Sequence, residues 1–149
     1  MRTTDMVRRS GIAIAADHTV AQAARIMEQS GVGALAVLDS ERLVGIVTDR
    51  DIVRRAVARD LPTDARIDAV MSTPVVTIEA DADVHTAFKL FREHSFRRLA
   101  VVRDDQFVGM LTVDDILIEL ASDLSDLTRP IENEVVHAQR DATVPAKVP

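Results

Sequence analysis

The chain repeats itself. Residues 16–56 align without a gap onto residues 80–120, and 12 of the 41 aligned pairs are identical, while most of the others keep their apolar or polar character. The identical pairs near the end of the copies are Gly45/Gly109, Thr48/Thr112, Asp51/Asp115 and Ile52/Ile116. A repeat constrains architecture strongly, because each copy must build the same small unit. The sequence therefore predicts a tandem duplication.

Each copy is predicted to form a β-α-β-β-α unit. A short extended start precedes a helix whose apolar residues recur at i, i+3, i+4 and i+7, which places them on one helical face. These residues are Val20, Ala23, Ala24 and Met27 in the first copy and Val84, Ala87, Phe88 and Phe91 in the second. Thr19 with Gln22 predicts a capping box, and Asp83 predicts an N-cap.

Two short apolar runs follow this helix in each copy. They flank the polar turns "DSER" (39–42) and "RDDQ" (103–106), and this pattern predicts a β-hairpin. A second helix is expected to begin at the residues just after each hairpin. The candidate first residues are Asp49 or Asp51 in the first copy and Val113 or Asp115 in the second.

A repeat of about 60 residues is marginally stable alone, so the two copies are expected to cover each other's apolar faces. Leu120, Leu124 and Leu127 extend an apolar stripe past the second repeat, and Pro130 is expected to end it. The predicted boundaries are 5–60 for the first repeat, 61–69 for a linker, 70–122 for the second repeat, and 123–149 for a helix end and polar tail.

Composition narrows the function. A formal net charge of −6 argues against a protein that coats nucleic acid or anionic lipid. The absence of Cys excludes disulfides, thiolate catalysis and Cys-ligated metal. We expect a cytoplasmic protein, since the start has no apolar core of a secretory signal and no apolar run reaches membrane-span length. The histidines share no metal-ligand spacing, so no metal site is expected; they are His18, His85, His94 and His137.

Enzyme motifs are absent from the sequence. There is no H-E-x-x-H, G-x-S-x-G, Walker loop or dinucleotide glycine fingerprint. The adjacent acids Asp114 and Asp115 do not face each other on a helix. We therefore predict no catalytic residues and no enzymatic activity.

The motif G-h-h-T-x-x-D (h apolar) stands at each junction between hairpin and second helix, and in this tandem it resembles the cystathionine-β-synthase (CBS) domain pair. The stretch "VMSTPVVTIEADADV", from Val70, also resembles that family's usual opening, whereas the first copy lacks the Pro. The resemblance covers residues 5 to about 121. It implies an α/β (α+β) fold whose repeats pack about a pseudo-two-fold axis and leave two clefts. It also implies a regulatory module that commonly forms flat homodimers.

The resemblance implies adenosine ligands: AMP, ADP, ATP or S-adenosylmethionine. Asp51 and Asp115 can each accept hydrogen bonds from both ribose hydroxyls. Thr48 and Thr112 offer hydroxyls at a helix N-terminus, where backbone N–H groups also face an anion. No cofactor is expected to be required.

The resemblance also implies how the clefts are assembled. Each joins the first strand of one copy to the Thr and Asp of the other. One cleft would contain Ile12, Val32, Gly33, Thr112, Asp114 and Asp115; the second would contain Val76, Phe96, Arg97, Arg98, Thr48, Arg50 and Asp51. Arg97 and Arg98 match a basic pair of the family, where the first copy has Gly33 and Ala34. The second cleft therefore has the better phosphate chemistry.

Alternatives remain open at this point. Thr-x-x-Asp at a helix start is also a capping box without any ligand, so the chain could be a dimerisation or docking scaffold. A nucleic-acid or metal binder could use the same clefts, although net acidity and the lack of Tyr and Trp count against base stacking. The sequence leaves undecided which nucleotide binds, whether both clefts fill, and which protein is regulated.

Overall fold

The computed structural model describes residues 1–7, 11–95 and 97–141, and the side chains as far as residue 131. The chain divides into two units, residues 1–113 and the helical segment from Asp114 onward. Each is described by itself. Among the described residues, no helix is both long and apolar enough to cross a membrane.

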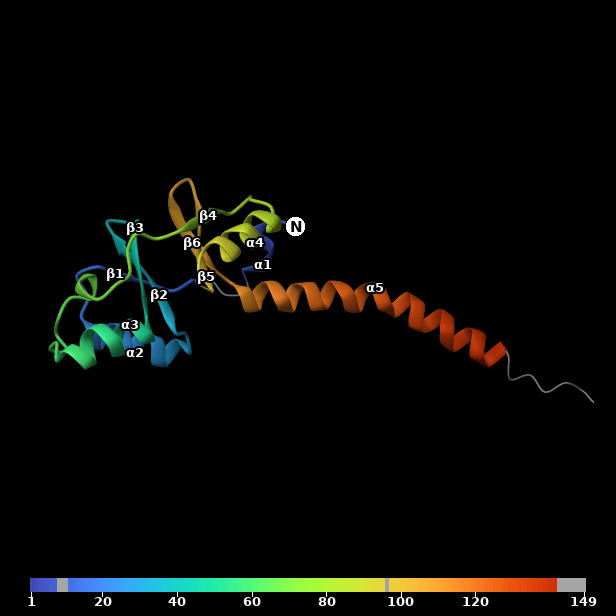
Figure 1. Ribbon diagram of the computed structural model, residues 1–149, viewed down its shortest axis with the longest axis horizontal. Coiled ribbons are helices and arrows are strands. Elements are labelled where there is room, and N and C mark those ends of the chain that lie inside the picture. Colours follow the sequence, from blue (N-terminus) through green and yellow to red (C-terminus); the bar gives the residue numbers. More distant parts are fainter. Residues whose placement is uncertain (8–10, 96, 142–149) are drawn as a thin grey trace, which may run out of the picture. The chain divides into compact units, whose positions relative to one another are not determined.

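The first unit is built on one six-stranded sheet (Figure 1). Its strands are β1 (Ala13–Ala15), β2 (Ala34–Asp39), β3 (Arg42–Thr48), β4 (Thr77–Glu79), β5 (Arg98–Arg103) and β6 (Gln106–Thr112). The order β1-β2-β3-β6-β5-β4 places the two repeats back to back, joined where Arg42 lies opposite Gln106. Counted inward from either edge, the first, second and third strands of one repeat follow in order. The sheet therefore has the pseudo-two-fold symmetry expected of a duplication.

Both predicted hairpins are confirmed. β2 pairs antiparallel with β3, and β5 with β6, and the register shifts at the equivalent places Val37/Leu38 and Val101/Val102. The two turn residues of each hairpin have positive φ; they are Ser40, Glu41, Asp104 and Asp105. Two successive residues with positive φ match the right-handed twist of the flanking strands. The equivalent turns show that the repeat extends to backbone detail.

The helices are α1 (Thr3–Met6), α2 (Val20–Ser30), α3 (Asp49–Asp51), α4 (Val84–Glu93) and α5 (Val113–Asp141). The sequence did not predict α1, whereas α2 and α4 begin where their caps predict, and α3 and α5 begin at the first of the two candidate residues, Asp49 and Val113. Thr19 and Gln22 form the capping box of α2, and Asp83 accepts a hydrogen bond from the His85 N–H at α4. Gly31 ends α2 with φ of 64°, a left-handed conformation that glycine adopts without strain. Beyond α3 the helix widens into a π-helical turn, η1 (Ile52–Ala56), and ends as a 3-10 turn, η2 (Val57–Arg59).

The segment that leads into each repeat is held by the other repeat. In Figure 1, α1 lies beside α4, although α1 precedes β1 in the chain. The N–H groups of Thr3 and Thr4 donate to the carbonyls of Ala82 and Ala80 at 2.9 and 3.0 Å. The buried Thr3 hydroxyl donates to the carbonyls of Glu79 and Ala80. The N-terminal segment therefore belongs structurally to the second repeat.

The exchange is reciprocal. The 3-10 turn η3 (Ile67–Ala69) leads into the second repeat, yet the N–H groups of Ile67 and Asp68 donate to the carbonyls of His18 and Ala16. These bonds are the Thr3 and Thr4 bonds moved along by 64 residues. Ile67 and Val70 are fully buried and complete the core of the first repeat; that core also contains Ile14, Val20, Ala23, Met27, Leu35, Val37, Val47 and Ala56.

The prediction that Pro130 ends the last helix was wrong. α5 continues through Pro130 to Asp141 and is 29 residues long. Proline removes one backbone N–H and thus one helical hydrogen bond. At this position the exposed residues on both sides allow the freed carbonyl to be hydrated, so the helix tolerates the loss. The segment predicted as a helix end and polar tail is helical up to Asp141.

Candidate functional site

The repeated motif forms a reciprocal cap at the end of β3. The Thr48 N–H donates to Asp51 Oδ2 at 3.0 Å, and the Asp51 N–H donates to Thr48 Oγ1 at 3.1 Å. Because the Thr48 hydroxyl oxygen accepts in this cap, its proton can be donated elsewhere. The structural interpretation of Thr-x-x-Asp is therefore confirmed for the first copy, and the cap leaves capacity for a ligand.

Asp51 also reaches into the other repeat. The Ser72 hydroxyl lies 3.2 Å from both carboxylate oxygens of Asp51 and donates to them. Ser72 is held in turn by a backbone pair with Ile46, in which each N–H donates to the other's carbonyl, at 2.7 and 3.2 Å. The carboxylate thus has a fixed orientation: Oδ1 accepts from Ser72, and Oδ2 accepts from both Ser72 and the Thr48 N–H.

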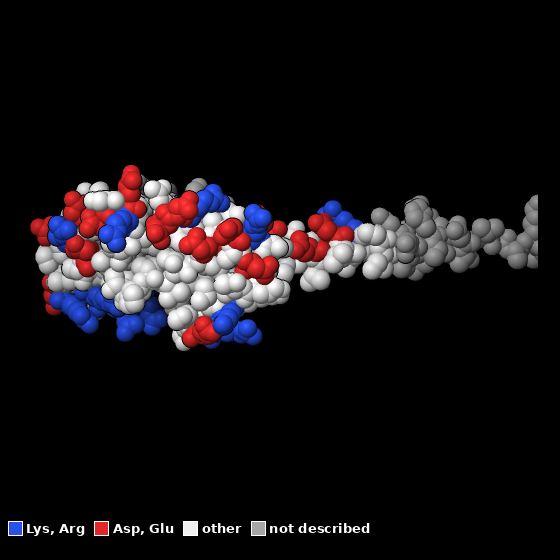
Figure 2. Space-filling model, turned by 90° about the horizontal axis from the view of Figure 1, so that it is seen from above, with Lys and Arg blue, Asp and Glu red and all other residues white. Residues whose placement is uncertain are grey.

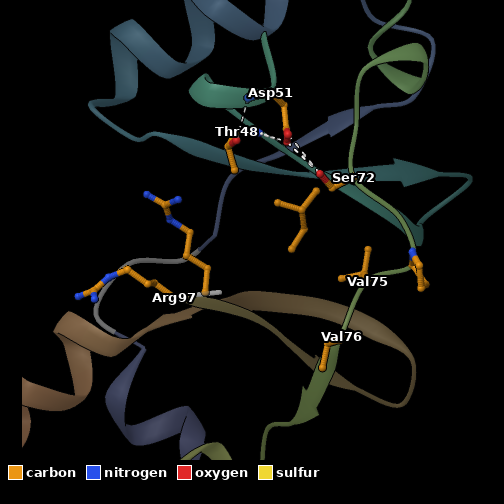
Figure 3. A pocket seen from close by; sticks show the side chains of 9 residues that line it. Thr48, Asp51, Ser72, Val75, Val76 and Arg97 are labelled. Atoms are coloured by element: carbon orange, nitrogen blue, oxygen red, sulfur yellow. Dashed lines mark hydrogen bonds between the residues drawn. The ribbon is translucent and has the colours of Figure 1, made fainter. Parts of the chain in front are cut away.

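A cavity of about 240 Å³ opens beside this carboxylate. The first repeat contributes Ile46, Thr48 and Asp51; the segment leading into the second repeat and β5 contribute Ser72, Pro74, Val75, Val76, Arg97 and Arg98. Figure 3 shows Thr48, Asp51 and Ser72 joined by hydrogen bonds on one side, with Val75, Val76 and Arg97 on the other. The cavity therefore places a polar cluster and two arginines around an apolar slot.

Arg97 and Arg98 precede β5 and begin it, next to the first repeat. The guanidinium of Arg98 extends to Gly33, since a Cβ built on Gly33 would lie 3.5 Å from Arg98 Nη2 and 3.1 Å from Asp49 Oδ2. The Asp49 N–H donates to the Gly33 carbonyl at 3.0 Å, so this is the N-terminus of α3. Arg98 thus reaches from the second repeat to the start of the first repeat's second helix.

Most residues of the second predicted cleft come together here. Thr48, Asp51, Val76, Arg97 and Arg98 all line the cavity. Arg50 is exposed and is not among the lining residues; its N–H donates to Asp49 Oδ1 at 2.8 Å. Phe96 lies outside the described residues.

The first predicted cleft stays a prediction. Ile12 and Val32 are half-buried and pack against the core of the first repeat, and Thr112 ends β6. Asp114 and Asp115 lie in the first turn of α5, which belongs to the other unit. Because these acids and the segment from Ile12 to Gly33 belong to separately described units, their grouping in one cleft remains an expectation from the family resemblance.

Sequence reasoning missed Arg55. Its Nη1 donates to the carbonyls of Val70 and Met71 at 3.2 and 2.9 Å and so holds the backbone just before Ser72. The equivalent residue of the second repeat is Glu119, which cannot donate in this way. Arg55 lies in the π-helical turn η1, and such turns recur at functional sites. In the sequence, the replacement of Arg55 by Glu119 at the equivalent position of the second repeat was the one sign that Arg55 has a role specific to the first.

We expect Arg55→Met to loosen this wall of the cavity. The change keeps an unbranched side chain but removes the Nη1 donor of both hydrogen bonds. This loss costs about 1–3 kcal/mol and lowers the melting temperature by roughly 2–4 °C per kcal/mol. Hydrogen exchange should show the Ser72 amide losing protection. Arg59→Met, at an exposed position of η2, is the matched control. Equal effects of the two substitutions would contradict a holding role for Arg55.

Gly45 lies against the side chain of Met71. A Cβ on Gly45 would lie 2.4 Å from Sδ and 2.9 Å from Cγ of Met71. Met71 precedes Ser72, so this close contact brings the segment that carries Ser72 against β3. The glycine of the repeated motif therefore helps to place the cavity wall.

Comparison with known proteins is consistent with this architecture. The family model described as "CBS domain" matches residues 4–58 and 67–122. The CBS domain-containing protein YhcV of Bacillus subtilis is 31% identical over 112 residues, which are 75% of this chain and 80% of YhcV.

Two solved structures at 28% identity have the same fold. The CBS domain protein PAE2072 from Pyrobaculum aerophilum, complexed with AMP, superposes with a TM-score of 0.71 over 82% of this chain and 99% of that one. Hypoxic Response Protein I, with two coordinated zinc ions, has a TM-score of 0.71 over 78% and 97% of the two chains. In the described part of the present chain, no group of three or more His, Asp or Glu side chains is placed to hold a metal.

The family match covers both halves of the duplication, and the sheet and the cavity between the repeats agree with it. The chain belongs to the CBS-domain family and is a tandem CBS-domain pair, a regulatory module.

Proposed function

We propose that the chain senses an adenosine-containing ligand, such as AMP, ADP, ATP or S-adenosylmethionine, in the cavity between its repeats. Binding would change a surface that a second copy or a regulated protein contacts. The protein would act as a cytoplasmic homodimer without catalysis of its own. Copies of the ligand would bind first at the cavity that contains Asp51.

The observation that carries this proposal is the composition of the cavity. Asp51 offers the paired acceptors that a ribose diol needs, the Thr48 hydroxyl offers a donor, and the valines offer an apolar slot for a base. Arg97 and Arg98 supply positive charge for phosphate. At about 240 Å³ the cavity is smaller than the roughly 300–1,000 Å³ of a typical ligand pocket. A nucleotide would therefore extend beyond it, with its phosphate toward the arginines.

The AMP complex of PAE2072 supports the same ligand class, since that protein shares this fold at 28% identity. A ligand-free scaffold is the second candidate. It is favoured by the reciprocal Thr48–Asp51 cap, which needs no ligand to explain it. The first copy also has no basic pair, since Gly33 and Ala34 stand at the positions of Arg97 and Arg98. If a nucleotide binds, this difference favours at most one occupied cleft.

Dye-monitored thermal unfolding separates the two candidates. The panel contains adenosine, AMP, ADP, ATP and S-adenosylmethionine, with GMP as a control for the base. A ligand at about a hundred times its dissociation constant stabilises the native state by roughly 2.7 kcal/mol, which raises the melting temperature by roughly 2–4 °C per kcal/mol. We expect a shift for at least one adenine compound, none for GMP, and loss of the shift in Asp51→Ala. No shift with any compound would contradict the sensor and leave the scaffold.

A further inference from the structure

Two opposite charges from different repeats approach the same glycine. Arg98 Nη2 and Asp49 Oδ2 lie 3.5 and 3.1 Å from the point where a Cβ on Gly33 would stand. The guanidinium and the carboxylate are therefore no further apart than these two distances together. This separation is shorter than the screening length of about 8 Å at physiological salt, so the two charges act on each other.

The pair occurs in only one half of the duplication. Ala34 stands at the position in the first repeat that is equivalent to Arg98, and Val113 stands at the position in the second repeat that is equivalent to Asp49. The cation and the carboxylate are thus present together in one arrangement, and both are replaced by apolar residues in the other. A carboxylate that served only the local helix start would not need to follow the arginine. The joint occurrence indicates that Asp49 acts on Arg98.

Asp49 stands outside the cavity that contains Asp51. Thr48, Asp51 and Arg98 line the cavity, whereas Asp49 is exposed and is not among the lining residues. The cavity of about 240 Å³ holds only part of a nucleotide, so the phosphate end extends past its arginines. A phosphate chain that grows beyond Arg98 in the direction of Gly33 brings its negative charge closer to the Asp49 carboxylate.

The surrounding surface attracts anions without selecting among them. In Figure 2, Lys and Arg side chains gather along one edge of the first unit, at the end where Figure 1 shows α3. The segment that begins with α3 contains Arg50, Arg54, Arg55 and Arg59. A basic surface raises the local concentration of every anion. Selection among phosphates needs a negative charge close to the bound phosphate, and Asp49 supplies one next to Arg98.

We propose that Asp49 is a specificity-determining residue that limits the negative charge of the bound ligand. In the empty site its carboxylate attracts the Arg98 guanidinium, and in the occupied site it repels a phosphate chain that extends past Arg98. The formal charges of Arg97, Arg98, Asp49 and Asp51 cancel, so the site favours an adenosine monophosphate over the diphosphate and triphosphate. This inference rests on the proposed function, since it names the phosphate class that the same cavity accepts.

Calorimetric titration with AMP, ADP and ATP in magnesium-free buffer tests the selection. The wild type should bind AMP more tightly than ATP. Asp49→Asn should bind ATP about tenfold more tightly than the wild type does, and AMP by a smaller factor, because the repulsion that is removed grows with the charge of the ligand. Wild-type protein that binds ATP more tightly than AMP would overturn the proposal and leave the sensor standing.

Asp60→Asn is the matched control. It makes the same charge change at an exposed position that follows η2, in a left-handed conformation that Asn also adopts. Asp60 lies about 16 Å from Asp49 along the helical segment, which is beyond the screening length. If Asp49→Asn and Asp60→Asn change the affinity for ATP equally, the effect is one of net charge and Asp49 has no part in specificity.

Inorganic tripolyphosphate tests the same place without a nucleoside. In thermal unfolding it should stabilise Asp49→Asn more than the wild type, and the gain should shrink in an Arg98→Gln background, because the two residues act on one anion. This response together with no stabilisation by any adenosine compound would support the role of Asp49 and overturn the adenosine sensor. Protein that binds AMP but shows the same gain with and without Arg98 would overturn the pair and leave the sensor.

Discussion

Replacing Asp51 by Asn is expected to weaken adenine-nucleotide binding by at least about 100-fold. The carboxylate already accepts from the Thr48 N–H and the Ser72 hydroxyl, so its remaining capacity is what a ribose diol would use. An amide keeps one acceptor oxygen and loses the charge. Hydrogen bonds to a charged group contribute about 1.5–3 kcal/mol each, and about 1.4 kcal/mol is a factor of ten in affinity. Titration calorimetry on both proteins measures the change.

A ligand cycle makes this prediction specific to the diol. The wild type should bind AMP much more tightly than 2′-deoxy-AMP, whereas Asp51→Asn should bind both with similar affinity, because the group that reads the hydroxyl is gone. Asp115→Asn is the control for the equivalent position of the motif. If Asp51→Asn still discriminates between the two nucleotides, Asp51 does not contact the ribose.

Ile67→Ala is expected to destabilise the first repeat, although Ile67 leads into the second. The side chain is fully buried in the core that contains Val20 and Leu35. Truncating a buried Ile costs about 2–5 kcal/mol and should lower the melting temperature by roughly 2–4 °C per kcal/mol. Hydrogen exchange by mass spectrometry should show the loss of protection in α2 and β2.

The matched control is Val57→Ala, at a side chain that is 67% exposed. A surface truncation of this kind changes stability by no more than about 0.5 kcal/mol. Were the lost protection in Ile67→Ala confined to β4, α4 and β5, the exchange of leading segments would not describe the protein in solution.

Local patterns in the sequence predicted local structure well. The Thr19–Gln22 and Asp83 caps and the two hairpin turns depend on residues at most three positions apart, so their geometry follows from spacing alone. The repeat then indicated how the elements pair, because two units of the same pattern favour a symmetric sheet. The family resemblance predicted one cleft for a set of residues that all line the observed cavity: Thr48, Asp51, Val76, Arg97 and Arg98.

Contacts between segments far apart in the sequence could not be predicted in this way, because no local residue pattern marks them. Nothing near Ile67 in the sequence indicates that it packs in the first repeat, because the first-repeat residues of that core, from Ile14 to Ala56, precede it by 11 to 53 positions. The Ser72–Asp51 and Arg55–Met71 bonds arise only once that packing brings the segments together. The prediction that the helix ends at Pro130 was wrong because proline weakens a helix locally but does not determine where a long helix ends.

The exchanged leading segments also bear on how the chain is made. Synthesis proceeds from the N-terminus, so every strand of the first half leaves the ribosome before Ile67 and Val70, which complete its core. The core of the first half can therefore be completed only after the first residues of the second half have been synthesised. The second half differs, because α1 has been synthesised before it. A gene for one half alone would encode a protein whose core is completed only when two chains exchange their N-terminal segments. In a fusion of two such genes, the same exchange of segments takes place within a single polypeptide.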